Sequence, residues 1–151
     1  MAAISGSCLC GAVTFSVARK PRSVTQCNCA ACRRYGTLWA YYRRDEVTIT
    51  APRGGLRDFR RRPRGLRFRH CAQCGCVVSW EDEAGHDARM AVNSRLLDHA
   101  VMARVPISVL DGDKTWRVLE RYVQPSAWIT AGAPAGSATA VRRRARGGRG
   151  A

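Results

Sequence analysis

The sequence predicts an all-β domain built from short strands. Several short runs are rich in Val, Ile, Thr and aromatic residues, and in one of them Val13, Phe15 and Val17 alternate with more polar residues. Gly, Pro and Asp-Gly breaks separate the runs at intervals typical of a barrel or sandwich. The expected strands are residues 11–17, 37–42, 46–50, 66–70, 77–81, 88–92 and 107–110, with one short helical turn within 93–100.

The length of 151 residues fits one domain followed by a short tail. Hydrophobic residues make up 46% of the chain, which is a globular share and excludes a disordered polycation. We expect the domain to occupy residues 1–130. Ala, Gly and Arg dominate residues 131–151, and this composition predicts a flexible tail.

The sequence favours a cytoplasmic protein with no membrane span. The N-terminus has neither a basic start nor a long apolar run, so no secretory signal is predicted. The uncharged stretch 122–141 is interrupted by Pro and Gly and has few large apolar residues, whereas a spanning helix needs about 20 predominantly apolar residues. In a reducing compartment, cysteine thiols stay free.

The eight cysteines fall into three tight groups: Cys8 and Cys10; Cys27, Cys29 and Cys32; Cys71, Cys74 and Cys76. Clustered thiols of this kind bind metal more often than they form disulfides when the compartment is reducing. Eight thiols allow about 105 disulfide pairings, and nothing in the spacing selects one of them. Zinc is the expected ion because thiolates hold it in tetrahedral sites.

Residues 71–75 form a CxxCG knuckle, in which the two-residue spacer lets Cys71 and Cys74 face one ion. The glycine after the second cysteine permits a tight turn with a positive φ. By spacing alone, the remaining two ligands come either from Cys8-Leu9-Cys10 or from the group at residues 27–32. Three thiolates leave one tetrahedral position open, as catalytic zinc sites do.

The segments GSCLCGAV (6–13), CNCAACRR (27–34) and CAQCG (71–75) resemble the three cysteine motifs of the glutathione-dependent formaldehyde-activating enzyme family, which includes centromere protein V. The resemblance implies a zinc-stapled β-tent (Mss4-like) domain of short antiparallel strands with two zinc ions per chain. It assigns one ion, with a structural role, to Cys8, Cys10, Cys71 and Cys74. The resemblance assigns a second, catalytic ion to Cys27, Cys29 and Cys32.

The activity implied by the resemblance is that of a carbon–sulfur lyase acting on thiol–aldehyde adducts such as S-hydroxymethylglutathione. Glutathione would then be the thiol substrate, and it carries two carboxylates. Arg33 and Arg34 directly follow Cys32, where guanidinium groups can bind a carboxylate; the alternative is that they are solvated charges.

Cys76 stands where this family commonly has Ser or Thr. On an extended strand its side chain projects to the same side as that of Cys74, which leaves two alternatives. In the first, Cys76 is a fourth ligand that closes the catalytic site. In the second, it is a buried thiol that packs as a small hydrophobic residue.

The charge of the chain supports a different function. Lys and Arg total 26 against 11 Asp and Glu, which gives a net charge of +15. Eight arginines lie within residues 53–69, and a further basic run lies close to the C-terminus. Such clusters bind phosphate backbones without sequence specificity, and a solvated basic face explains them equally well. The alternative function is therefore a non-catalytic zinc module that binds nucleic acid through this patch and the tail.

Overall fold

The structure is a computed structural model that describes residues 4–61, 65–83 and 88–124. Within these ranges the chain consists mainly of short strands, which confirms the all-β prediction. The predicted tail, residues 131–151, lies outside the described residues. The strands are β1 (Ile4–Ser7), β2 (Thr14–Val17), β3 (Val24–Cys27), β4 (Trp39–Arg43), β5 (Val47–Thr50), β6 (Leu56–Arg61), β7 (Leu66–Cys71), β8 (Val77–Asp82), β9 (Arg89–Asn93), β10 (Pro106–Leu110) and β11 (Val118–Val123).

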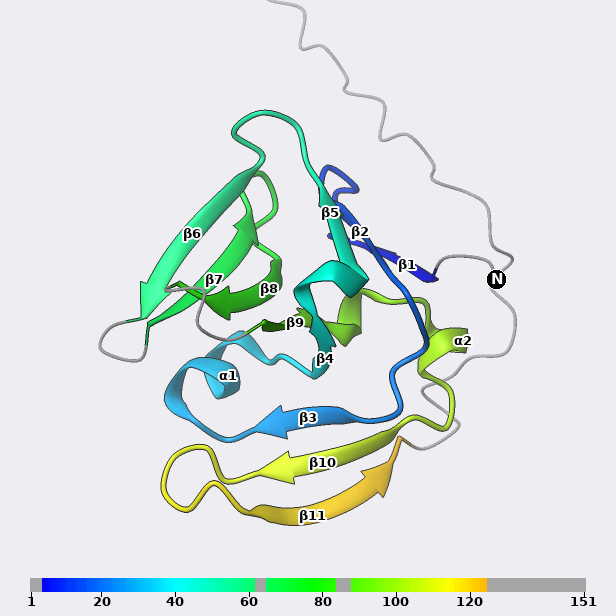
Figure 1. Cartoon of the computed structure of the whole chain (residues 1–151), viewed down its shortest axis with the longest axis vertical. Helices are drawn as coiled ribbons and strands as arrows, with labels where there is room; N and C mark the ends of the chain where they lie inside the picture. The colour runs from blue at the N-terminus through cyan, green and yellow to red at the C-terminus, as the bar shows by residue number, and fades with distance from the viewer. Residues whose placement is uncertain (1–3, 62–64, 84–87, 125–151) are drawn as a thin grey trace, which may run out of the picture.

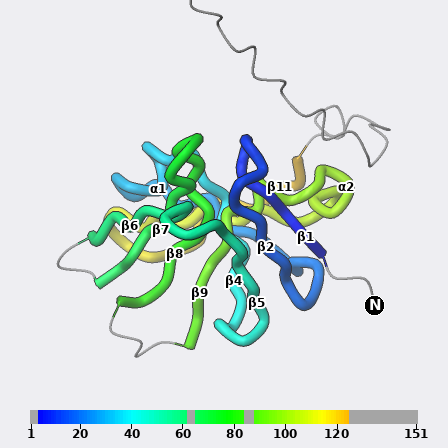
Figure 2. The backbone as a smooth tube through the Cα atoms, turned by 90° about the horizontal axis from the view of Figure 1, so that it is seen from above, coloured from blue at the N-terminus to red at the C-terminus, as the bar shows by residue number. Residues whose placement is uncertain are grey.

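The strands form two sheets. The small sheet has the order β1-β2-β5, and the large sheet has the order β11-β10-β3-β4-β9-β8-β7-β6. In both views β6, β7 and β8 lie to the left of the small sheet (Figure 1, Figure 2). Neighbouring strands are antiparallel except for β3 and β10, which pair in parallel and so depart from the expected arrangement.

The main core contains the predicted alternating face of β2. Val13, Phe15 and Val17 are buried and pack with residues of the large sheet such as Val78 and Val92. The large sheet also curls. Leu110 on β10 and Phe68 on β7 line one cavity although their strands lie far apart in the strand order.

Four strands and one helix are not predicted by the sequence pattern: β1, β3, β6, β11 and α1 (Ala30–Tyr35). The strand β1 has the sequence ISGS and β6 has the sequence LRDFRR, so neither shows an apolar face. The helix α1 is only six residues long and ends at Gly36, whose φ is +62°. The expected helical turn at 93–100 is present as η2 (Ser94–Leu96) and the start of α2 (His99–Met102).

A buried carboxylate organises the arginine-rich part of the large sheet. The Glu81 side chain on β8 is only 1% exposed and forms ion pairs with Arg44 and Arg67. Arg69 also approaches Glu81, at 3.9 Å, and Asp58, at 3.5 Å. Because Arg67 and Arg69 both lie on β7 and Asp58 on β6, these charges connect three neighbouring strands.

We expect Glu81→Ala to lower the free energy of unfolding by about 3 kcal/mol, since it leaves partly buried arginines without their carboxylate. Urea unfolding of the metal-loaded protein measures this loss. Glu83→Ala is the matched control, because its partner Arg60 is 54% exposed and the pair is worth about 1 kcal/mol or less. Equal losses of unfolding free energy in the two variants would show that the burial of Glu81 does not make its ion pairs more important for stability.

Candidate metal centres and the cavity beside them

The first cysteine cluster joins the two sheets. Cys8 and Cys10 lie in the turn that follows β1, Cys71 ends β7, and Cys74 lies in the turn before β8. All four sulfur atoms lie within 4.8 Å of one another, with Sγ–Sγ distances of 3.5 Å from Cys8 to Cys10 and 3.6 Å from Cys10 to Cys71. A tetrahedron with zinc–sulfur bonds of about 2.3 Å has edges of roughly 3.8 Å. The cluster therefore fits a zinc ion.

The backbone around this cluster has the predicted tight turns. Gly11 and Gly75 have φ values of +76° and +75°, and each donates its N–H to the carbonyl of a cysteine three or four residues earlier. Val13 N–H donates to Cys8 Sγ at 3.3 Å. Although burial opposes the effect, the backbone N–H groups of Cys76 and Cys10 help to lower the pKa of Cys74 to about 6. N–H donors of this kind favour the thiolate form that binds metal.

The second cluster is built within one short segment. Cys27 ends β3, Cys29 caps α1, and Cys32 lies three residues further along the helix. Their sulfur atoms also lie within 4.8 Å of one another, and all three residues are buried. Among the described residues, no further Cys, His, Asp or Glu joins this group. A tetrahedral ion held here would keep one position for a substrate.

Each sulfur of the second cluster accepts a hydrogen bond. Cys29 N–H donates to Cys27 Sγ at 3.4 Å, Trp39 Nε1–H to Cys32 Sγ at 3.1 Å, and the Arg61 guanidinium to Cys29 Sγ at 3.4 Å. A hydrogen bond from the Cys32 thiol lowers the pKa of Cys27 to about 6, and the same bond together with burial raises the pKa of Cys32. Binding a divalent ion would release the remaining thiol protons.

Cys76 lies beside the first cluster rather than the second. It is partly buried, packs against the main core, and interacts with Cys74. Burial raises the pKa of its thiol. The hypothesis that Cys76 closes the three-cysteine site is therefore wrong, and the alternative of a thiol packed in the core agrees with the structure.

A turn from a distant part of the chain fixes the second cluster. Asn28 Nδ2 donates to Asp111 Oδ1 at 3.0 Å, and Asp113 N–H donates to Asn28 Oδ1 at 3.2 Å. The hydrogen bonds from Asn28 and then from Thr115 lower the pKa of Asp111 to about 2, so it remains a carboxylate. The sequence pattern does not predict the role of these residues, and the only signal for it was an amide side chain between two cysteines.

Gly112 belongs to the same turn and lies against a sulfur atom. A Cβ atom at this position would lie 2.3 Å from Cys27 Sγ, which is far inside van der Waals contact. The Gly112 N–H group also contributes to lowering the pKa of Cys27. The second cluster therefore requires glycine here because no side chain fits.

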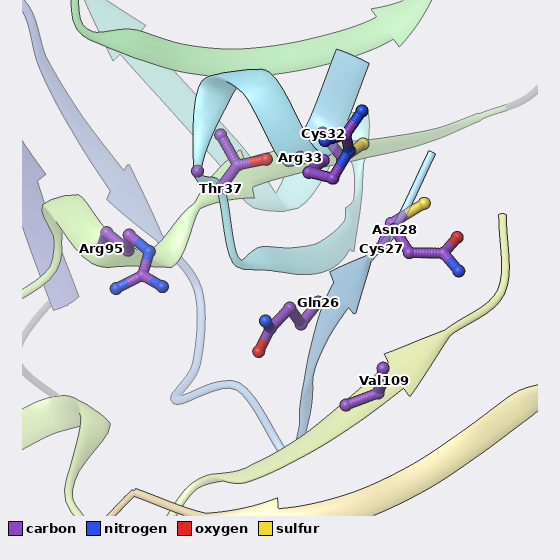
Figure 3. A pocket seen from close by; sticks show the side chains of 9 residues that line it. Gln26, Cys27, Asn28, Cys32, Arg33, Thr37, Arg95 and Val109 are labelled. Carbon is purple, nitrogen blue, oxygen red and sulfur yellow. The ribbon is translucent and has the colours of Figure 1, made fainter. Parts of the chain in front are cut away.

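Two cavities adjoin the second cluster. The larger has a volume of about 620 Å³ and is lined by all three cysteines. Its other lining residues are Trp39, Tyr41, Arg61, Leu66, Phe68, Trp80, Asp82, Arg89, Leu110 and Trp116. The smaller has a volume of about 210 Å³, shares Cys27 and Cys32, and has Arg33, Thr37 and Arg95 on its walls (Figure 3).

The two arginines that follow Cys32 point to different places. Arg33 lines the smaller cavity. Arg34 donates to the Ala30 carbonyl at 3.0 Å within α1 and is exposed. Only Arg33 is therefore placed beside the cysteine cluster.

Comparison with known proteins agrees with this geometry. The family model described as glutathione-dependent formaldehyde-activating enzyme matches residues 3–109. The chain belongs to this family. A search of curated proteins gives no match. A crystal structure of a Rhodobacter sphaeroides protein is similar to 63% of this chain and 88% of its own, with 24% identity and a TM-score of 0.56, which supports the fold alone.

The formaldehyde-activating family resemblance stated from the three cysteine motifs is thus confirmed. This family is associated with metal, which agrees with the two cysteine groups of the chain. In the parts of the chain that the structure describes, no helix has both the length and the apolar character needed to cross a membrane.

If each cysteine cluster holds one zinc ion, we expect Gly112→Ala to bind one ion per chain in place of two, because the new methyl group displaces Cys27 Sγ. Elemental analysis of the purified chains counts the metal, and circular dichroism reports whether the fold is kept. Asp113→Ala is the matched control, since only the backbone of Asp113 contacts Asn28. A full complement of two ions in Gly112→Ala would show that the cluster does not depend on this contact.

Cys76→Ser should leave both the zinc content and the affinity for zinc unchanged, since the Cys76 sulfur belongs to neither cluster. Competition with a chromophoric chelator measures the affinity of each site. Cys71→Ser provides the positive comparison and should lose the first ion. Loss of an ion from the Cys76→Ser protein would show that Cys76 is a metal ligand, contrary to the geometry.

Proposed function

We propose that this protein is a zinc-dependent carbon–sulfur lyase that makes and breaks adducts of a small thiol and an aldehyde, as between glutathione and formaldehyde. In the forward direction the thiol sulfur bonds to the carbonyl carbon, and the thiol proton ends on the carbonyl oxygen. The observation that carries the proposal is the buried set of three thiols opening onto a cavity. Membership of the formaldehyde-activating family supports it.

The two cysteine clusters have different roles in this proposal. Cys8, Cys10, Cys71 and Cys74 would hold a structural zinc ion between the sheets. Cys27, Cys29 and Cys32 would hold the second ion, which when bound stabilises a thiolate and polarises an aldehyde carbonyl. The chain itself orients these sulfurs through their N–H donors and through the bond from Asn28 to Asp111.

The smaller cavity suits a carboxylate of the thiol substrate. Arg33 and Arg95 both line it. Thr37 lines it too, is 2% exposed, and its Oγ1 has no hydrogen-bond partner in the structure. A buried hydroxyl without a partner is rare in proteins, and a ligand oxygen would satisfy it. We therefore assign the carboxylate contact to Arg33 rather than to Arg34.

Nucleic-acid binding is the less supported candidate. Arg60, Arg67 and Arg69, which belong to the basic run at 53–69, are paired with acidic residues. Ion pairing reduces the charge that remains available to phosphates. The tail on which this candidate also depends lies outside the described residues.

Exchange spectroscopy by NMR, with glutathione and formaldehyde, tests the proposed reaction. The zinc-loaded protein should increase the rate of adduct formation and breakdown, and Cys29→Ser should lose about 100-fold or more of that increase together with one zinc ion. The fold should remain, because the first cluster is unchanged. An undiminished rate in Cys29→Ser would refute the assignment of this site.

Arg33→Ala should raise the KM for glutathione about tenfold and leave kcat close to its original value, since a charged contact to a carboxylate that takes no part in the bond change mainly supports binding. Arg34→Ala is the matched control because its side chain donates within its own helix. Steady-state kinetics with varied glutathione separates the two constants. Equal KM values for the two variants would remove Arg33 from the substrate site.

A further inference from the structure

The larger cavity is far bigger than formaldehyde needs. Its volume is about 620 Å³, which lies within the range of roughly 300–1,000 Å³ typical of sites for drug-sized ligands. Formaldehyde has two non-hydrogen atoms and would leave nearly all of this space to solvent. One carboxylate of the thiol substrate is assigned to the smaller cavity, which shares Cys27 and Cys32 with the larger one, so the larger cavity is open to a group on the other side of the reacting sulfur.

Aromatic residues are the most numerous class on the walls of the larger cavity, beside the three cysteines, two leucines and the charged residues Arg61, Asp82 and Arg89. Five rings line it, those of Trp39, Tyr41, Phe68, Trp80 and Trp116. Trp80 packs edge-on against Trp39, with centroids 6.5 Å apart and planes at 82°, and against Tyr41 at 5.9 Å and 76°. Aromatic groups favour this edge-to-face geometry, so a flat ring entering the cavity would find partners of the right kind.

Trp116 lines the cavity in a strained backbone conformation. Its side chain is 60% exposed, and its φ of +57° is unusual for a residue with a bulky side chain. The turn holds this conformation because Trp116 N–H donates to the Asp111 carbonyl at 2.7 Å and Asp111 N–H donates to the Arg117 carbonyl at 2.9 Å. Backbone strain that presents an exposed indole to a cavity is characteristic of functional sites.

The position of the rings relative to the sulfurs selects the part of the substrate that they contact. Trp39 donates to Cys32 Sγ, and Cys27, Cys29 and Cys32 line the same cavity as the rings. A group that enters this cavity is therefore next to the carbon that bonds to the thiol sulfur. With the thiol held by its carboxylate in the smaller cavity, the group left for the larger one is the substituent of the aldehyde.

We propose that the aldehyde substrate carries an aromatic substituent, so that the protein acts on adducts of a thiol with an aryl aldehyde in preference to those of formaldehyde. This inference rests on the proposed function, which supplies the reaction of a thiol with an aldehyde. The aromatic rings of the larger cavity indicate which class of aldehyde reacts. The reaction is balanced as before: the sulfur–carbon bond forms and the thiol proton passes to the carbonyl oxygen. No oxidant, reductant or further reactant takes part.

Binding of unreactive adduct analogues tests the substrate class apart from catalysis. The zinc-loaded protein should bind S-benzylglutathione about tenfold or more tightly than S-methylglutathione, because the phenyl group is removed from water. Isothermal titration calorimetry gives both constants, and quenching of tryptophan fluorescence reports contact with the indoles. Equal binding of the two probes, or binding of neither, would overturn the proposal.

Two variants of Trp116 test whether this residue produces the preference for the benzyl probe. Trp116→Ala should reduce the ratio of the two affinities about threefold or more, and Trp116→Phe should restore most of it. Leu119→Ala is the matched control, since Leu119 is 62% exposed but does not line the cavity. An unchanged ratio in Trp116→Ala would remove Trp116 from the site.

Rates with benzaldehyde and formaldehyde separate the two proposals. Faster turnover of the benzaldehyde adduct agrees with both. Turnover confined to formaldehyde, without a preference for the benzyl probe, overturns the aromatic substrate and leaves the lyase function standing. A preference for the benzyl probe with no turnover of either aldehyde overturns the lyase function and retains the aromatic site.

Discussion

The four-cysteine cluster is the contact on which the arrangement of the two sheets depends. The small sheet has only three strands of four residues each, so it buries its apolar face against the large sheet. Apolar packing from β2 supplies part of the contact. Cys8 and Cys10 face Cys71 and Cys74 at a second point of contact. An ion bound by these four thiols would tie the two sheets together there.

The second cluster is constructed on a different plan. Its three thiols come from six consecutive residues, 27–32, so the ligand set is local. Its supports are not local: Trp39, Arg61 and Asp111 reach it from β4, β6 and the segment after β10. A change in these supporting residues would alter the sulfur environment without removing any ligand.

The sequence pattern predicts the strands whose apolar residues alternate and the glycines of the knuckle turns, since both features are set by neighbouring residues. It does not predict β6, whose Asp58 pairs with Arg67 and Arg69 of β7 only once the two strands lie side by side. It also treats Arg33 and Arg34 as equivalent. In the structure they lie on a helix, where successive side chains diverge by about 100°.

Short spacings made each group of cysteines recognisable as a source of metal ligands, but only the family resemblance predicted that Cys8 and Cys10 join Cys71 and Cys74. The aromatic cavity was not predictable. Its rings come from β4, β7, β8 and the segment before β11, and they meet only because the large sheet curls. The spacing of these residues along the chain does not predict that their rings lie together.

The turn after β10, residues 111–116, contributes to both the second cluster and the larger cavity. Asp111 anchors Asn28, Gly112 leaves room for the Cys27 sulfur, and Trp116 faces the aromatic cavity. Lengthening or shortening this loop would disturb the geometry of the thiols and the shape of the larger cavity together. Substitutions on the walls contributed by β4, β7 and β8 would change the shape of the cavity alone, so the two features can vary separately only if the length of this loop stays fixed.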